Sequence, residues 1–200
     1  MAEFINKPPP EEATHGLTGE EKYISVLIAR LPAFYSMAEG KSPLESTNLL
    51  NGCFKKVVPP ILSHKGRVDQ YVVSVVPAVV ARFGAPIPIV ERRIVEAVAA
   101  ALEIGQIMKE ASLPVTLTVN RGLAYVGNIG TEDRIQYTIV GPMVNEAFSM
   151  SARQKPDTII VMGRKIEEDT EVLSLIQKSA LAINLRPLWD EPGPAYQLTI

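Results

Sequence analysis

The sequence predicts an α+β fold in which strands and helices alternate and some strands form antiparallel hairpins. Short runs rich in Val, Ile and Leu recur along the chain and are typical of buried strands. Two longer segments, residues 43–64 and 89–110, carry apolar residues at helical spacing. Residues 67–83 are rich in Val over a length that fits two strands joined by a hairpin. Helices interspersed with hairpin-connected strands indicate an α+β domain.

The first part of the chain predicts a lead-in, a strand and a helix. Residues 1–19 are polar and include three consecutive prolines, which indicates a flexible lead-in to a single domain at residues 20–200. The run KYISVLIA at residues 22–29 predicts a buried strand. The predicted helix at 43–64 begins on a proline, which suits a first turn. The proline pair at 59–60 is expected to disturb or end its last turns.

The rest of the chain predicts a turn, a hairpin and a series of shorter elements. Residues 65–66 predict a turn, and the register of the hairpin within 67–83 stays open around Pro77. The other predicted elements are strands at 115–119, 122–126, 135–140, 158–162, 180–188 and 195–199, and helices at 142–153 and 164–173.

Composition is that of an ordinary globular protein. The 200 residues suffice for one domain with a proper core, and 46% are apolar against 21% charged. A formal net charge of −2 argues against non-specific nucleic-acid binding, which requires a basic surface. No apolar run approaches the roughly 20 residues that span a bilayer, and the first residues lack an apolar signal core. We therefore expect a soluble cytoplasmic protein with no membrane span and no nucleic-acid partner.

The most informative stretch is residues 125–147, YVGNIGTEDRIQYTIVGPMVNEA. It contains a glycine-punctuated turn, a charged loop, an apolar strand and a Gly-Pro start to a helix. It closely resembles the class III nucleotide cyclase segment that reads G-N-x-G and then R-x-D-Y-T-x-x-G-D-x-V-N-x-A-x-R. The resemblance extends over about residues 22–198, through the segments ISVLIARLPAF, LLNGCFKKVVPPILSHKGRVDQY, RFGAP and EPGPAYQL. It implies a ferredoxin-like βαββαβ core with extra C-terminal strands.

The resemblance also implies a chemistry against which single positions can be compared. Cyclases of this family act as dimers, with the active site at the dimer interface. One subunit supplies two aspartates that hold two divalent metals, and the other supplies a base-reading pair, an asparagine and an arginine. The ribose 3′-hydroxyl attacks the α-phosphate and pyrophosphate leaves, a displacement that two metal ions favour by activating the nucleophile and neutralising charge.

The positions that match the metal-binding aspartates carry other residues. Arg30 stands at the first position, and counting from the two ends of the hairpin places the second at Ser74 or at Pro77. A cation repels Mg²⁺, and neither alternative at the second position is a hard anionic ligand. Asp69 lies nearby, but the family commonly carries an acidic residue there that is not a metal ligand. We therefore expect no metal site and no cofactor.

The positions that match the substrate-reading residues are mostly replaced as well. The base-reading lysine corresponds to Gln70, or to Val73 in the other register, and its acidic partner corresponds to Gln136. Asn145 matches the family asparagine. Ser149, one helical turn later, replaces the arginine of the transition state.

Three hypotheses follow. The favoured one is a degenerate cyclase homology domain that is not an enzyme. It would act as a regulatory or dimerisation module in signalling, as a homodimer or heterodimer, with a possible signalling partner. The first alternative is a divergent active cyclase that uses Mg²⁺ or Mn²⁺ on other ligands, such as Asp69 and Glu39. The second alternative is a non-catalytic nucleotide or small-ligand sensor, with Gln70, Gln136 and Asn145 as candidate contacts.

Overall fold

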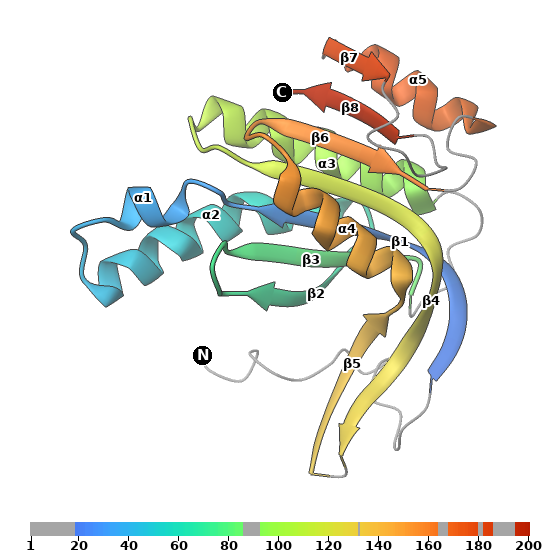
Figure 1. Cartoon of the computed structure of the whole chain (residues 1–200), viewed down its shortest axis with the longest axis horizontal. Helices are drawn as coiled ribbons and strands as arrows, with labels where there is room; N and C mark the ends of the chain where they lie inside the picture. The colour runs from blue at the N-terminus through green and yellow to red at the C-terminus, as the bar shows by residue number, and fades with distance from the viewer. Residues whose placement is uncertain (1–18, 86–92, 132, 164–167, 180–181, 186–194) are drawn as a thin grey trace.

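A computed structural model describes residues 19–85, 93–131, 133–163, 168–179, 182–185 and 195–200. The predicted α+β class is confirmed. Within these residues one sheet of eight strands has the order β2-β3-β1-β4-β6-β8-β7, and β5 pairs with β4 beside this path (Figure 1). The strands are β1 (Gly19–Arg30), β2 (Arg67–Val72), β3 (Ala78–Phe83), β4 (Thr116–Thr131), β5 (Arg134–Val140), β6 (Thr158–Met162), β7 (Ala182–Leu185) and β8 (Ala195–Thr199).

The first four strands form the ferredoxin-like core that the resemblance implied. Their order in the sheet is β2-β3-β1-β4. The three pairings β2–β3, β3–β1 and β1–β4 are all antiparallel. The strands β6, β8 and β7 extend this core beyond β4, and the β4–β6 pairing is parallel. The described helices are α1 (Phe34–Ala38), α2 (Pro43–Ser63), α3 (Arg93–Glu110), α4 (Pro142–Arg153) and α5 (Thr170–Lys178).

Alternation along β1 separates two hydrophobic clusters on the two faces of the sheet. Leu27 and Ala29 point to the face covered by α2, α3 and α5. Ile24, Val26 and Ile28 point to the other face, where they pack with apolar side chains of α4. Figure 1 shows α4 on the near side of the sheet and α3 on the far side. Every side chain of β1 from Ile24 to Ala29 is buried, so this strand is the centre of the domain.

Helix α2 begins with a reciprocal cap. The Ser42 backbone N–H donates to the Glu45 carboxylate at 2.8 Å, and the Glu45 N–H donates to Ser42 Oγ at 3.3 Å. The helix predicted at 43–64 is confirmed as α2, and the proline pair at 59–60 does not end it, because the helix continues to Ser63. The residues four positions earlier, Lys55 and Lys56, are exposed, so water can solvate the carbonyls that lose their N–H partners.

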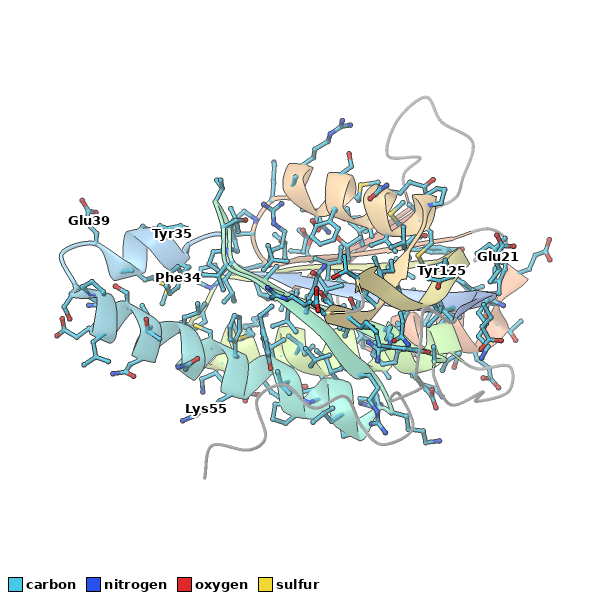
Figure 2. The ribbon with its side chains drawn as sticks, turned by 90° about the horizontal axis from the view of Figure 1, so that it is seen from below. Glu21, Phe34, Tyr35, Glu39, Lys55 and Tyr125 are labelled. Atoms are coloured by element: carbon cyan, nitrogen blue, oxygen red, sulfur yellow. The ribbon has the colours of Figure 1, made fainter. Side chains whose placement is uncertain are left out.

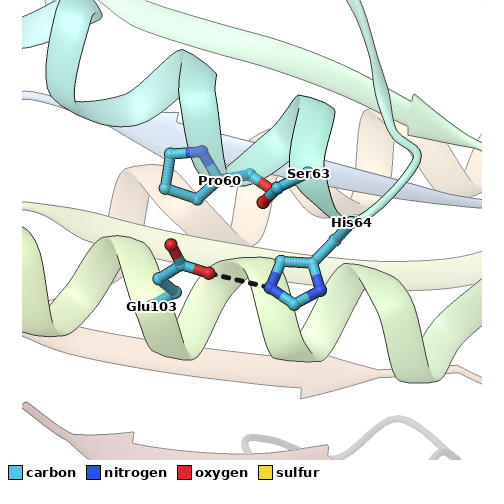
Figure 3. Close-up of polar contacts among 4 residues, drawn as sticks. All are labelled: Pro60, Ser63, His64 and Glu103. Carbon is cyan, nitrogen blue, oxygen red and sulfur yellow. Dashed lines mark hydrogen bonds and ion pairs between the residues drawn. The ribbon is translucent and has the colours of Figure 1, made fainter.

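Contacts beyond the proline pair hold the end of α2 in place. Pro60 itself is buried, and its carbonyl accepts from the His64 N–H at 3.1 Å and from Ser63 Oγ at 3.0 Å. His64 Nε2 lies 2.8 Å from Glu103 Oε2 on α3, as Figure 3 shows. Burial and this contact between α2 and α3 outweigh the intrinsic tendency of proline to end a helix.

Two predicted strands at 115–119 and 122–126 are in fact the single strand β4. Gly122, the first residue of the second predicted strand, lies within β4 opposite Ile24. A Cβ atom at Gly122 would lie 2.9 Å from Cβ of Met143, so this glycine allows α4 to approach the sheet closely. The glycine therefore marks helix packing, which local sequence does not distinguish from a strand break.

Further along the chain two boundaries differ from the prediction. The helix expected at 164–173 is α5, which begins at Thr170 and runs to Lys178, with the Asp169 side chain accepting from the Val172 N–H. The strand expected at 180–188 is described as β7, Ala182–Leu185. Parts of these elements, the first residues of the helix expected at 89–110 and almost all of the predicted lead-in lie outside the described residues.

Residues 125–131 of β4 together with β5 form a hairpin that we call the arm. It extends away from the body of the domain (Figure 1). Gly130 has φ of +138°, and a Cβ atom there would lie 2.0 Å from the Arg134 carbonyl oxygen. Only glycine fits at this position.

In the described residues, no helix is long and apolar enough to cross a membrane.

Replacing Ser42 by Ala removes the side-chain acceptor at the start of α2, and we expect a loss of about 1 kcal/mol in the free energy of unfolding. Urea denaturation measures this. Asn51→Ala, at an exposed position in the same helix, is the matched control and should change stability by less than about 0.5 kcal/mol. Equal stability of both variants would contradict the role of the cap.

Candidate functional site

The end of β1 carries a cation. Arg30 is the last residue of the strand, is half-buried, and lies between Ala78 of β3 and Thr116 of β4. Burial lowers the pKa of Arg30 from its ordinary value, yet a guanidinium remains protonated in proteins. The ion pairs of the described residues involve other cations, so the Arg30 charge is not neutralised by a neighbouring carboxylate there.

The hairpin between β2 and β3 reaches the same place. Val72 pairs with Ala78, which leaves residues 73–77 as its loop. The Pro77 carbonyl accepts from the Leu31 N–H at 2.9 Å, and the Ser74 carbonyl accepts from the Tyr35 hydroxyl at 2.6 Å. Both positions considered in the sequence therefore contact the segment that follows Arg30, and both do so through backbone carbonyls that already accept hydrogen bonds.

Helix α1 is fixed next to this loop by aromatic side chains. Phe34 is buried in the main cluster, and its ring packs edge-on against Tyr35 with the ring centroids 5.1 Å apart. Figure 2 shows both rings on α1, with Glu39 at the outer end of the helix. Glu39 is exposed. Sequence reasoning did not anticipate the bond from Tyr35 to the hairpin, because it joins residues 39 positions apart.

Asp69 has a structural partner for each carboxylate oxygen. Its Oδ1 accepts from Nη1 of Arg82 at 2.7 Å, and its Oδ2 accepts from the Thr138 hydroxyl at 2.6 Å. The exposed fractions of the Asp69 and Arg82 side chains are 0% and 2%. Burial raises the pKa of Asp69, while the Thr138 hydrogen bond and the charge of Arg82 act in the opposite direction.

The same group extends to an aromatic ring and to the arm. The Arg82 guanidinium carbon lies 4.9 Å from the centroid of the Tyr137 ring, within the range of a cation–π contact. Because Thr138 and Tyr137 belong to β5, this cluster joins β2 and β3 to the arm. Asp69 therefore serves to hold strands together, and its carboxylate oxygens are directed at protein donors.

The candidate substrate-reading residues fall into two groups. Gln70 lies opposite Val80 on β3, and Gln136 lies opposite Ile129 in the arm. The strands that carry these glutamines, β2 and β5, are joined by the Asp69–Thr138 hydrogen bond. Asn145 and Ser149 are exposed on one face of α4, and among the described residues no hydrogen bond joins Asn145 to either glutamine.

One residue near Arg30 was missed by sequence reasoning. Thr116 is 2% exposed, and its hydroxyl has no hydrogen-bond partner in the described structure. The signal that could have found it is the alternation of polar side chains at Thr116, Thr118 and Asn120, which places all three on one face of β4.

Replacing Asp69 by Ala leaves the buried Arg82 charge uncompensated, and we expect a loss of about 3–5 kcal/mol in the free energy of unfolding. Guanidinium denaturation measures it. Asp133→Ala, at an exposed position in the arm, should change stability by less than about 0.5 kcal/mol. A stable Asp69→Ala protein that has lost a response to Mg²⁺ shown by the wild type would instead make Asp69 a metal ligand.

No protein-family model matches the chain. Among curated proteins, the uncharacterized Mycobacterium tuberculosis protein Rv1319c is 29% identical over 159 residues, which cover 78% of this chain and 29% of that protein. Rv1318c of the same organism is 27% identical over 161 residues, with coverage of 78% and 29%. The chain thus spans less than a third of the length of these relatives.

Solved structures give the more specific comparison. The guanylyl cyclase Cya2 has 24% identity and a TM-score of 0.70, over 90% of this chain and 93% of that one. The adenylyl cyclase CyaB from P. aeruginosa has 23% identity and a TM-score of 0.71, over 92% and 97%. A dimeric guanylyl cyclase domain of the RhoGC fusion protein from Blastocladiella emersonii has 16% identity and the same TM-score, 0.71, over 92% and 97%. The chain therefore has the fold of a class III nucleotide cyclase catalytic domain.

Proposed function

We propose that this chain is a regulatory homology module built on the cyclase fold, and that it does not cyclise nucleoside triphosphates. The observation that carries the proposal is Arg30 at the end of β1, beside a hairpin loop that offers backbone carbonyls rather than carboxylates. The setting we propose is cytoplasmic signalling, with a second copy or a related domain as the partner.

Charge is the first support. Two-metal catalysis needs carboxylates that hold both ions at the reacting phosphate. Arg30 places a positive charge at one of the positions where the family carries a carboxylate, and neither Ser74 nor Pro77 supplies a negative charge at the other. The residues present thus do not fit a pair of divalent metals.

The arginine that stabilises the transition state in the family is also missing. In the family an arginine one helical turn after the asparagine adds positive charge to the reacting phosphate. Here Asn145 is followed on the same exposed face of α4 by Ser149, which is neutral. A hydroxyl donates one hydrogen bond but does not replace the charge and bidentate geometry of a guanidinium.

The alternative of a divergent cyclase depends on Asp69 and Glu39 as substitute ligands. Both oxygens of Asp69 accept hydrogen bonds inside the protein, and using them for a metal would break the contact with buried Arg82. Glu39 is exposed beyond the end of α1. These positions favour the non-catalytic proposal.

A non-catalytic nucleotide or small-ligand sensor is the second candidate. One observation favours it: Gln70 and Gln136 lie on strands that the Asp69–Thr138 hydrogen bond draws together. Both side chains carry a donor and an acceptor, so together they could read the edge of a base without charge.

A dimer is the expected assembly. The arm and the adjoining part of β4 expose apolar side chains that the body of the domain does not cover, and grouped apolar exposure marks interaction surfaces. Leu123, Ile129 and Val140 share one face of this hairpin, and Ile135 is exposed on the other. The similar guanylyl cyclase domain of the RhoGC fusion protein is itself dimeric, which supports a cyclase-type pairing for this chain.

Purified protein incubated with ATP or GTP and with Mg²⁺ or Mn²⁺ should form no cyclic nucleotide above a metal-free control, detected by mass spectrometry. We expect turnover at least about a thousandfold below that of an active adenylyl cyclase assayed in parallel, because the charges that stabilise the transition state are missing. Neither metal should raise the melting temperature, since an ion that binds the native state would stabilise it. Clear cyclic product would refute the proposal.

Replacing Leu123 or Ile129 by Glu should weaken self-association at least about tenfold, because a charge would be buried in the contact. Sedimentation velocity over a concentration series measures the dissociation constant. Leu62→Glu, at an exposed apolar position on α2 away from the arm, is the matched control and should leave association unchanged. A wild-type protein that stays monomeric at every concentration, or an equal effect of the control, would contradict an arm-mediated homodimer.

A further inference from the structure

The surface formed by Arg30, Tyr35, Val73 and Val75, which we call the β1-end surface, combines an unpaired cation with exposed apolar side chains. We propose that it binds a partner protein through a segment in which one Asp or Glu carboxylate is flanked by apolar side chains. The carboxylate would contact Arg30, and the apolar side chains would cover the loop between β2 and β3. This inference goes beyond the proposed function, because it assigns a second kind of partner to a different part of the domain.

Arg30 supplies the charge of the β1-end surface. Its side chain is half-buried, and its cross-strand neighbours, Ala78 and Thr116, are neutral. The ion pairs of the described residues all involve other cations. A partly desolvated cation attracts an anion more strongly than the same charge in bulk water. Arg30 can therefore bind an external carboxylate, which fits a guanidinium through two parallel hydrogen bonds.

The loop between β2 and β3 supplies the apolar part of this surface. Residues 73–77 lead directly into Ala78, the residue opposite Arg30. Within this loop, the exposed fractions of Val73 and Val75 are 64% and 86%. Grouped apolar side chains that remain in water mark interaction sites on soluble proteins. A partner that covers these valines would therefore gain free energy from apolar burial, in addition to the contact with Arg30.

Tyr35 holds the β1-end surface in one arrangement. Its hydroxyl donates to the Ser74 carbonyl at 2.6 Å, and its ring packs edge-on against the buried ring of Phe34. The Tyr35 side chain is nevertheless 52% exposed, so it is available to a partner. Tyr and Arg are over-represented among the residues that contribute most to protein–protein binding. Because the hydrogen bond orders the loop beforehand, docking costs less conformational entropy.

The charges around this surface favour a protein segment over other anionic partners. Glu39 is exposed at the outer end of α1, and the chain has a formal net charge of −2. An anionic membrane or a nucleic acid is bound by clusters of Lys and Arg, which such a charge balance opposes. A single cation beside apolar side chains instead matches a single carboxylate beside apolar side chains.

The β1-end surface is separate from the arm. Figure 2 shows Tyr35 at one end of the domain and Tyr125, the first residue of the arm, at the other. Strand β1 connects the two regions, with Gly19 paired in the arm and Arg30 at the far end of the strand. A partner bound at the β1 end therefore leaves the exposed apolar side chains of the arm accessible.

The test is selection of phage-displayed random peptides on the full chain, followed by fluorescence polarisation with the enriched peptides in synthetic form. The enriched peptides should carry Asp or Glu between apolar residues. Arg30→Gln should weaken their binding about tenfold or more, and Arg30→Lys should recover part of it, since a charged hydrogen bond is lost and then partly restored. Val75→Ser should weaken binding about fivefold, because apolar burial is lost.

Two variants at exposed positions are the matched controls. Arg134→Gln removes a cation in the arm, and Leu62→Ser removes an apolar side chain on α2, so both should leave peptide binding unchanged. Circular dichroism confirms that every variant folds. Because binding is measured without metal or nucleotide, its result is independent of the cyclase assay.

Four results would overturn the proposal. They are the absence of any enriched peptide, enrichment of peptides that lack an acidic residue, and peptide binding that Arg30→Gln leaves intact. The fourth is a loss of self-association in Arg30→Gln, measured by sedimentation velocity, which would assign the β1-end surface to a second copy of this chain.

Discussion

The pairing of β1 with β4 is the constraint on which the rest of the structure depends. It runs in unbroken register from Gly19 opposite Gly127 to Arg30 opposite Thr116. Because side chains alternate along both strands, this register assigns one set to the α2–α3 face and the other to the α4 face. A slip of one residue would move Arg30 and Thr116 away from the α4 face and expose the centre of the core.

Two pairs of polar residues in this sheet differ in how their hydrogen-bonding groups and charges are satisfied. Asp69 and Arg82 are deeply buried and form an ion pair, and because both carboxylate oxygens of Asp69 accept hydrogen bonds, Asp69 has little capacity left for a ligand. Arg30 and Thr116 are placed with equal precision but do not satisfy each other's bonding capacity within the described residues. The first pair is typical of structural polar clusters, whereas the charge of Arg30 has no carboxylate partner among the described residues.

Local patterning predicted the elements that periodicity defines, including the central strand, the long α2 and the helix at Pro142–Arg153. It failed where tertiary contact decides the outcome. Residues 120–121 continue β4 because they pair with β1, and the proline pair lies inside α2, where Pro60 is buried. Arg30, Ser149 and the alternatives Ser74 and Pro77 could be proposed from a resemblance, since they match motif positions. The Tyr35 bond to Ser74 and the unpartnered Thr116 hydroxyl could not, because both depend on residues that only the folded chain brings together.

The hydrogen bond from the Thr138 hydroxyl to Asp69 restricts movement of the arm. It belongs to the arm, while the carboxylate that it contacts belongs to β2, at the other side of the core sheet. Swinging the arm away from β2 would break a hydrogen bond to a buried charged group, a cost of about 1.5–3 kcal/mol. The Thr138 hydrogen bond therefore holds the arm against β2. A partner that binds the exposed apolar side chains of the arm must either preserve this hydrogen bond or supply the free energy to break it. A ligand of the arm that changes this hydrogen bond would therefore act on β2 as well.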